Sequence, residues 1–256
     1  MIIKRVLIFV FTLLLGVQLV HAGGVYDRQW DSANTAYMNG DWAGAIAIYD
    51  SIEGAGMVSP KLYYNMGGAH FKNGSIGKAV LYYNKALRLD PADEDTQYNL
   101  RVAEGYVKDQ IEVVPEFFAS RWMRGVRTAM SSNAWAVTSL VMLLVALVAL
   151  MFYLLPIGLR YRKVGFGVAV VAGLLVVLSM SFASAQRTRA LHSSEAVVMQ
   201  SAVPVKSSPE RTSKDIFVIH EGTRVTVLDR LGDWSEVSIA DGNKGWLLTS
   251  SIAIID

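Results

Sequence analysis

The spacing of apolar and polar positions divides the chain into three regions. From residue 26 to about 111, apolar residues recur every three or four positions, a pattern typical of amphipathic helices. From 134 to 186, charged residues are absent apart from one short basic turn. From 195 onward, apolar and polar residues alternate, and this alternation predicts short β-strands. We therefore expect a helical part, a membrane part and a β part, in that order.

The helical region repeats itself after 34 residues. The segment "NGDWAGAIAIYD" begins at Asn39, and the similar segment "NGSIGKAVLYYN" begins at Asn73. The shift superposes small and aromatic residues in pairs: Gly40 on Gly74, Ala45 on Ala79, Ile46 on Val80 and Tyr49 on Tyr83. A period of this length is the signature of a repeat built from two helices.

The residue types at these positions have physical roles that fit a helical hairpin. Each Asn-Gly can supply the left-handed residue that ends one helix. Asp41 and Ser75 then stand where the next helix needs an N-cap. Ala45 and Ala79 are expected where two antiparallel helices cross, because a larger side chain there would push the helices apart.

The second unit resembles the tetratricopeptide repeat family. The resemblance is carried by Tyr63, Met66, Gly67, His70, Gly74, Ala79, Tyr83, Ala86 and Pro91. His70 stands where an aromatic residue is usual, and the first unit is degenerate. We expect repeats at about 26–59 and 60–93 and a capping helix at 93–111, within a repeat domain that spans 23–115.

In that family, the first helix of each pair lines a concave binding face. The family register places eight residues of this chain there: Trp30, Asn34, Tyr37, Lys61, Tyr64, Phe71, Lys72 and Tyr98. Aromatic side chains flanked by Asn and Lys suit an extended peptide or a partner helix. The alternative is that about half of them only pack. The family's carboxylate clamp is partly present, because Asn34 and Asn65 match it, whereas Trp30 and Tyr64 replace the lysines.

The N-terminus predicts export. Lys4 and Arg5 precede an apolar run, and Val20-His21-Ala22 fits a cleavage site, so residues 1–22 are interpreted as a signal peptide. An uncleaved membrane anchor is the alternative. The chain has no cysteine, so it uses no disulfides even though export permits them.

Two uncharged stretches are long enough to cross a bilayer. The first transmembrane helix is expected at 134–155, where twelve Leu, Val and Phe residues favour insertion by roughly 4–7 kcal/mol. The second is expected at 164–184. The turn between them, 156–163, carries three basic residues and is therefore expected in the cytoplasm. Both flanking regions would then lie outside.

Residues 116–133 are interpreted as an interfacial linker. Phe117, Phe118, Trp122 and Val126 would face the lipid while the neighbouring arginines meet headgroups. These arginines oppose the proposed orientation under the positive-inside rule. In the second span, Gly165, Ala169 and Gly173 are spaced by four and predict close packing against the first span. The ordinary glycine content of membrane helices is the alternative explanation.

The charge distribution argues against two classes of function, binding of nucleic acid and transport of ions or protons. Residues 116–194 carry 8 basic and 1 acidic side chains, whereas both flanking regions are mildly acidic. Neither flanking region offers the Lys/Arg stripe that binding to nucleic acid requires. Neither span carries a central Asp, Glu, Lys or Arg, and transport of ions or protons usually needs one.

Residues 195–256 predict a small β-barrel of about five strands. They resemble bacterial SH3-like domains at Gly222, Trp234, Val237, Asp241, Gly242, Gly245 and Trp246. Trp234 and Trp246 could form a ligand groove with Phe217. The alternative is that one or both tryptophans belong to the core.

No residue pattern points to catalysis. His192 and His220 lack the spacing of metal ligands, and no Gly-x-Ser-x-Gly elbow is present. We expect no catalytic residue, no metal site and no cofactor.

The order of these parts resembles the repeat-containing, BatE-like members of the Bat (Bacteroides aerotolerance) group. The junction "DEDTQYNLRVAEGYVKDQIEVVPEFFASRWMRGVRTAMSSNAWA" and the tail segments "EAVVMQSAVPVKSSPE" and "IHEGTRVTVLD" carry the resemblance. It implies a multidomain fold of tetratricopeptide-repeat hairpins, a two-helix transmembrane hairpin and a small SH3-like barrel.

The resemblance also implies a function. It points to a non-enzymatic, two-pass inner-membrane scaffold whose repeat and SH3-like domains lie in the periplasm. Its partners would be membrane proteins with von Willebrand A domains, and its process aerotolerance or envelope stress. A cell-wall protein that binds peptidoglycan through the SH3-like domain is the main alternative. A small transport component is a weaker one.

Overall fold

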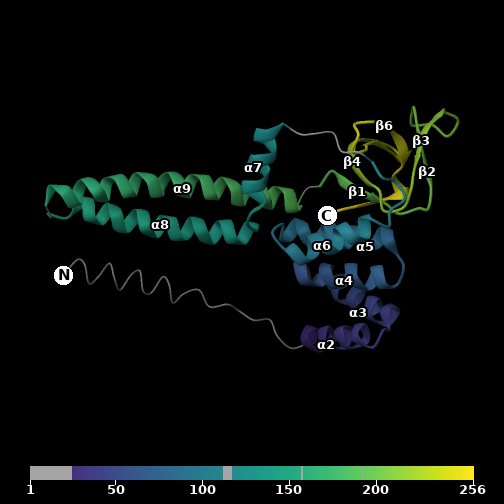
Figure 1. Cartoon of the computed structure of the whole chain (residues 1–256), viewed down its shortest axis with the longest axis horizontal. Coiled ribbons are helices and arrows are strands. Elements are labelled where there is room, and N and C mark those ends of the chain that lie inside the picture. Colours follow the sequence, from purple (N-terminus) through teal and green to yellow (C-terminus); the bar gives the residue numbers. More distant parts are fainter. Residues whose placement is uncertain (1–24, 112–116, 157, 192) are drawn as a thin grey trace.

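The computed structural model describes residues 25–111, 117–156, 158–191 and 193–256 (Figure 1). The predicted signal peptide at 1–22 lies outside these residues. The helices are α2 (Val25–Met38), α3 (Trp42–Gly54), α4 (Pro60–Lys72), α5 (Ile76–Leu89), α6 (Glu94–Glu104), α7 (Phe118–Thr128), α8 (Ser132–Leu154) and α9 (Leu159–Leu191). The strands are β1 (Glu195–Val198), β2 (Val203–Lys206), β3 (Asp215–Ile219), β4 (Arg224–Leu231), β5 (Trp234–Ser238), β6 (Lys244–Leu248) and β7 (Ile252–Ile254).

The helix ends in the repeats follow the local sequence. Gly40 and Gly74 have φ values of +79° and +80° and end α2 and α4 in the left-handed conformation. The Asp41 carboxylate accepts the Gly44 N–H at 2.9 Å and so caps α3. The Ser59 hydroxyl accepts the Leu62 N–H at 3.1 Å, directly before a proline that suits the first position of α4.

The cap of α5 comes from another part of the chain. Ser75 occupies the N-cap position, but its side chain makes no capping hydrogen bond. Instead, the Glu221 carboxylate, which follows β3, accepts the Gly77 N–H at 3.0 Å. A carboxylate at a helix N-terminus also interacts favourably with the helix dipole. Ser75 is therefore the N-cap residue by position, as predicted, but the β part of the chain supplies the hydrogen-bond acceptor.

Small residues bring the repeat helices together as their spacing predicts. Ala45 and Ala79 are completely buried. A Cβ added at Gly67 would lie 2.6 Å from the Tyr83 ring, so α4 and α5 approach closely only because this position is glycine. Tyr49 and Tyr83 fill the wider gaps as buried side chains. The core of the first unit continues through Ile52, Leu62, Met66 and Ala69.

The helices α8 and α9 are long and apolar enough to cross a membrane, judged by length and composition. They lie side by side and project away from the rest of the molecule (Figure 1). α9 begins at Leu159. The basic residues Arg160, Arg162 and Lys163, which are expected in the loop 156–163, therefore lie in the first turns of this helix.

The contact between α8 and α9 follows a period of seven rather than four. Gly165 does lie close to α8, because an added Cβ would be 2.9 Å from the Ala149 carbonyl oxygen. At Gly173, however, an added Cβ would meet nothing within 4 Å, and Ala169 is only half-buried. The buried positions of α9 are Gly165, Ala172, Ser179 and Gln186. A step of four residues drifts about 40° around an α-helix, whereas a step of seven stays on one face.

The β part forms one antiparallel sheet with the strand order β3-β2-β6-β5-β4-β1-β7. Seven strands are present where about five were predicted. The ladder ends at β3 on one side and β7 on the other, so the predicted closed barrel is not confirmed. The core of the sheet is built from residues such as Val198, Val205, Val237 and Leu247, all of which are completely buried.

The repeats and the sheet share a hydrophobic core. Val197 from β1 and Ile255 after β7 are fully buried in one cluster with Val80 of α5, Ala103 of α6 and Val107. The sheet therefore covers the last helices of the repeat stack. The predicted capping helix at 93–111 is helical only over α6 and continues as an irregular segment that contacts the sheet.

Candidate protein-binding surfaces

A groove of about 580 Å³ opens on the concave side of the first repeat. Its floor is a hydrogen-bonded network in which the Asn34 side-chain oxygen accepts from the Tyr49 hydroxyl at 2.8 Å and from the Asn65 amide at 3.1 Å. Tyr49 is buried, and this burial is the main reason why its pKa is raised above the usual value. The two asparagines and the tyrosine are thereby held in fixed positions at the groove surface.

Aromatic side chains flank this network. Trp30 packs edge-to-face on Tyr49 with 5.8 Å between ring centroids, and the Lys61 ammonium lies 5.6 Å from the Trp30 ring. Tyr37 lines the groove and packs against Trp42 at 4.9 Å. Trp30 and Tyr37 are both half-buried, so each combines a packing role with an exposed edge.

The second half of the concave face lies on α4 and α6. The Tyr64 hydroxyl accepts a hydrogen bond from the Asn99 amide at 3.0 Å. Phe71 packs edge-to-face on Tyr106 at 5.4 Å, and Tyr106 is itself 68 % exposed. Tyr98 is 61 % exposed on α6, while Lys72 is exposed at the end of α4. These aromatic groups offer contact area at low entropic cost, as anchors for a peptide do.

The structure thus brings part of the predicted binding face into one groove. Asn34 and Tyr37 line it directly, and Asn65 joins them from α4. Sequence reasoning missed Asn99 and Tyr106, which extend the face along α6 and its C-terminal end. Asn99 aligns with Asn65 after the 34-residue shift, so the repeat period itself held the signal for it.

A second surface lies on the outer side of β5 and β6. The register pairs Glu236 with Trp246 and Trp234 with Leu248, which places both tryptophans on the same face. Both are half-buried, whereas Ser235 and Leu247 on the opposite face are completely buried. Two partly exposed tryptophans on one sheet face can provide a stacking surface for a ligand.

Phe217 does not join this surface. Its cross-strand partner is Val205, which is completely buried, and the Phe217 ring packs against the core of the sheet. Phe217 therefore packs in the core of the sheet, and its predicted place in a groove with the two tryptophans is wrong.

Hydrogen bonds between polar groups connect the sheet to the segment that follows the repeats. The Asp109 carboxylate accepts from the His220 backbone N–H, from its ring Nδ1 and from the Thr223 hydroxyl, each at 2.6 Å. Burial alone would raise the pKa of Asp109, but these hydrogen bonds outweigh it and hold the pKa below its usual value. The Lys108 ammonium lies 2.9 Å from the other ring nitrogen of His220. Because an ammonium can only donate, Nδ1 is the nitrogen that carries the proton toward Asp109.

Close packing accompanies this polar contact. Gly222 has a φ of +88°, and a Cβ added to it would lie 2.6 Å from a methyl group of Val107. Arg224 of β4 reaches back to the repeats, where it pairs with Glu104 at 3.1 Å and donates to the Asn84 side chain at 3.3 Å. The two modules are therefore joined by apolar burial, hydrogen bonds and ion pairs together.

Two family models match segments of the chain. The tetratricopeptide repeat model matches residues 60–93, and the bacterial SH3 domain model matches residues 201–253. No curated protein matches the chain. Within the described ranges, no group of three His, Cys, Asp or Glu side chains lies close enough together to hold a metal ion. The chain therefore contains a tetratricopeptide repeat and a bacterial SH3 domain, joined by two apolar helices that could span a membrane.

Proposed function

We propose that this protein is a non-enzymatic scaffold in the inner membrane that displays two protein-binding modules on the periplasmic side. Repeat and SH3 domains of these families suggest binding of proteins and of cell-wall material. In this proposal α8 and α9 form a two-pass hairpin, and residues 1–22 direct the repeats across the membrane.

One observation carries this proposal. The repeats and the sheet share the buried cluster around Val80, Val107 and Ile255, so the two modules form one body at the same end of α8 and α9 (Figure 1). Whichever side of a membrane receives one module must therefore receive the other. An even number of spans between them satisfies this requirement.

The concave groove is the surface that we assign to the partner. Its fixed amides, Asn34 and Asn65, can pair with the backbone of an extended peptide, and the flanking aromatic groups can hold its side chains. By resemblance to the Bat group, the partners would be membrane proteins with von Willebrand A domains that act in aerotolerance or envelope stress.

A photo-crosslinking residue placed in the groove tests this assignment in living cells. Met38 borders the groove and is 77 % exposed, whereas Ala47 is exposed on the other face of the repeat. The proposal predicts adducts with integral-membrane proteins from position 38 and none from position 47, and loss of the adducts in N34A/N65A. Equal adducts from both positions, or adducts that survive in N34A/N65A, would refute it.

A second candidate function is binding of the cell wall through the SH3 domain. The two tryptophans on the outer face of β5 and β6 favour it, because aromatic faces stack well on sugar rings. Sedimentation of the full chain in detergent with purified sacculi tests it. The chain should sediment with sacculi, and W234A/W246A should stay in solution, whereas the N34A/N65A variant should still sediment.

A further inference from the structure

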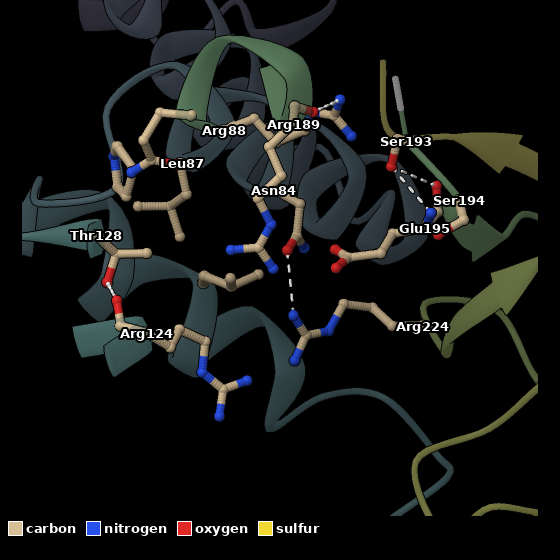
Figure 2. Close-up of a pocket in the computed structure, with 13 residues that line it drawn as sticks. Asn84, Leu87, Arg88, Arg124, Thr128, Arg189, Ser193, Ser194, Glu195 and Arg224 are labelled. Carbon is tan, nitrogen blue, oxygen red and sulfur yellow. Dashed lines mark hydrogen bonds between the residues drawn. The ribbon is translucent and has the colours of Figure 1, made fainter. Parts of the chain in front are cut away.

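A cavity of about 410 Å³ lies where the repeats, the sheet and the membrane helices meet (Figure 2). Its walls come from α5 and α6, from α7, from the last turns of α9 and from the start of the sheet. Four arginines line it, one from each of four elements: Arg88 of α5, Arg124 of α7, Arg189 of α9 and Arg224 of β4. Residues more than a hundred positions apart in the sequence thus contribute to a single site.

The charge of this cavity is unbalanced. Among the described residues that line it, four carry a guanidinium group and one, Glu195, carries a carboxylate. Arg224 pairs with Glu104, which lies outside the cavity. A partly enclosed space with excess positive charge is favourable for an anion, because guanidinium groups bind phosphate oxygens in a bidentate, charge-assisted way.

Arg88 gives the strongest single argument that the cavity binds an anion. Its two terminal nitrogens donate to the backbone carbonyl oxygens of Ile255 and Arg189, which fixes the side chain at the junction. Its Nε is buried and has no hydrogen-bond acceptor among the described residues. Burial is the main reason why the pKa of Arg88 is lowered, an effect that Glu195 and Asp256 only oppose in part. Because Arg88 also lines the cavity, a negative charge bound there would favour the charged form of its guanidinium.

The cavity also lies at the level where lipid headgroups would be. The uncharged stretch of α9 ends at Gln186, and Arg189 follows about 4.5 Å further along the helix axis. The headgroup layer is about 5–8 Å thick on each side of the hydrocarbon core. Beside the cavity, α7 exposes Phe118 and Trp122, which are 77 % and 59 % exposed and suit insertion at the interface.

We propose that this cavity binds the phosphate group of an anionic phospholipid from the leaflet that faces the soluble domains. The proposal rests on the proposed function only in that α8 and α9 must span a membrane. A bound headgroup would fix α7 and the end of α9 against the repeats and the sheet, and it would hold the scaffold in one orientation above the bilayer.

Native mass spectrometry of the full chain in nonionic detergent tests the proposal, with phosphatidylglycerol, phosphatidylcholine or millimolar inorganic phosphate as the probe. We expect phosphatidylglycerol to bind more tightly than phosphatidylcholine. Arg189→Gln should weaken that binding about tenfold, the value of one charge-assisted hydrogen bond. Glu195→Gln should tighten it. Arg230→Gln, which removes an exposed arginine of β4 outside the cavity, should leave it unchanged.

Other outcomes overturn the lipid site. Equal retention of both lipids, or equal loss in R189Q and R230Q, would show that the cavity does not select an anionic headgroup. Binding of inorganic phosphate with the same sensitivity to R189Q, without retention of lipid, would assign the cavity to a soluble anion instead. If R189Q does not fold, R124Q replaces it. Carbonate extraction of cell membranes separates the two proposals: a chain that washes off refutes the proposed function, whereas one that stays but retains no lipid refutes only this site.

Discussion

Replacement of His70 by phenylalanine should remove much of the acid sensitivity of the repeat domain. His70 is 3 % exposed, stacks on the Tyr82 ring at 5.3 Å, and neither of its ring nitrogens has a hydrogen-bond partner within the described part of the chain. Burial, with a smaller contribution from Lys78, lowers its pKa from 6.5 to about 4.

The sign of the effect follows from proton binding. Between pH 6.5 and about 4, the unfolded chain binds a proton at His70 and the folded chain does not, so unfolding becomes more favourable as the pH falls through this range. Each pH unit is worth about 1.4 kcal/mol, so His70 costs about 2 kcal/mol of stability at pH 5 and about 3 kcal/mol near pH 4. Phenylalanine cannot titrate, and it restores the aromatic residue that the repeat family usually has at this position.

Urea unfolding of the full chain in nonionic detergent, followed by circular dichroism at pH 7.5 and pH 5, measures this difference. The stability advantage of His70→Phe over the native chain should be about 2 kcal/mol larger at pH 5 than at pH 7.5. Lys78→Gln is the matched control and should keep most of the native acid sensitivity, because burial is the larger cause. A parallel loss of stability in the native chain and in H70F would refute the reasoning.

Three further predictions concern the contacts between parts of the chain. Gly222→Ala should destabilise the contact between the sheet and the repeats by about 1–3 kcal/mol, because it combines a left-handed φ with a clash against Val107. The segment 105–111 should then become more sensitive to protease. Asp109→Asn should lower the free energy of unfolding by about 1–3 kcal/mol at pH 7. The stabilisation from a carboxylate with a lowered pKa is present above about pH 3.8 and is lost below it. Urea unfolding should therefore show that the native chain and the variant become equally stable in strong acid. Gly165→Leu should separate α8 from α9. Gly167→Leu should not, because an added Cβ at Gly167 meets nothing within 4 Å. Energy transfer between labels on α8 and α9 in liposomes measures this separation in each variant.

Local signals explain what could be predicted from the sequence. Gly40 and Gly74 end their helices, and Ala45 and Ala79 are buried at crossings, because each role depends on the residue itself and on neighbours within a few turns. The same holds for the matched repeat at 60–93 and for the apolar lengths of α8 and α9. The alternation of residues after 195 predicted strands for the same reason.

Contacts between distant segments could not be predicted in this way. The acceptor that caps α5 is Glu221, 144 positions beyond Gly77, and the partner of Asp109 is His220, 111 positions away. No local pattern marks such pairs, so the repeats and the SH3 domain were expected as separate modules. The arginine cavity was missed for this reason too, since its walls exist only once the modules are docked.

The packing of α9 is a different case, because the sequence did hold the signal. Gly165 and Gly173 stand out as glycines, and their spacing directed attention to steps of four. The buried series Gly165, Ala172, Ser179 and Gln186 contains only one glycine, and it is visible only when small and polar residues are counted together at steps of seven.

A chain that lacks cysteine allows a direct test of the central claim that both modules form one body on the outer side of the membrane. The Lys85 ammonium of α5 lies 3.1 Å from the Asp256 carboxylate at the end of the sheet. Cysteines at these two positions should be joined by a short bismaleimide that does not cross membranes, added to intact spheroplasts. Joining only after permeabilisation would place the modules on the inner side, and failure to join under either condition would show that they do not pack together.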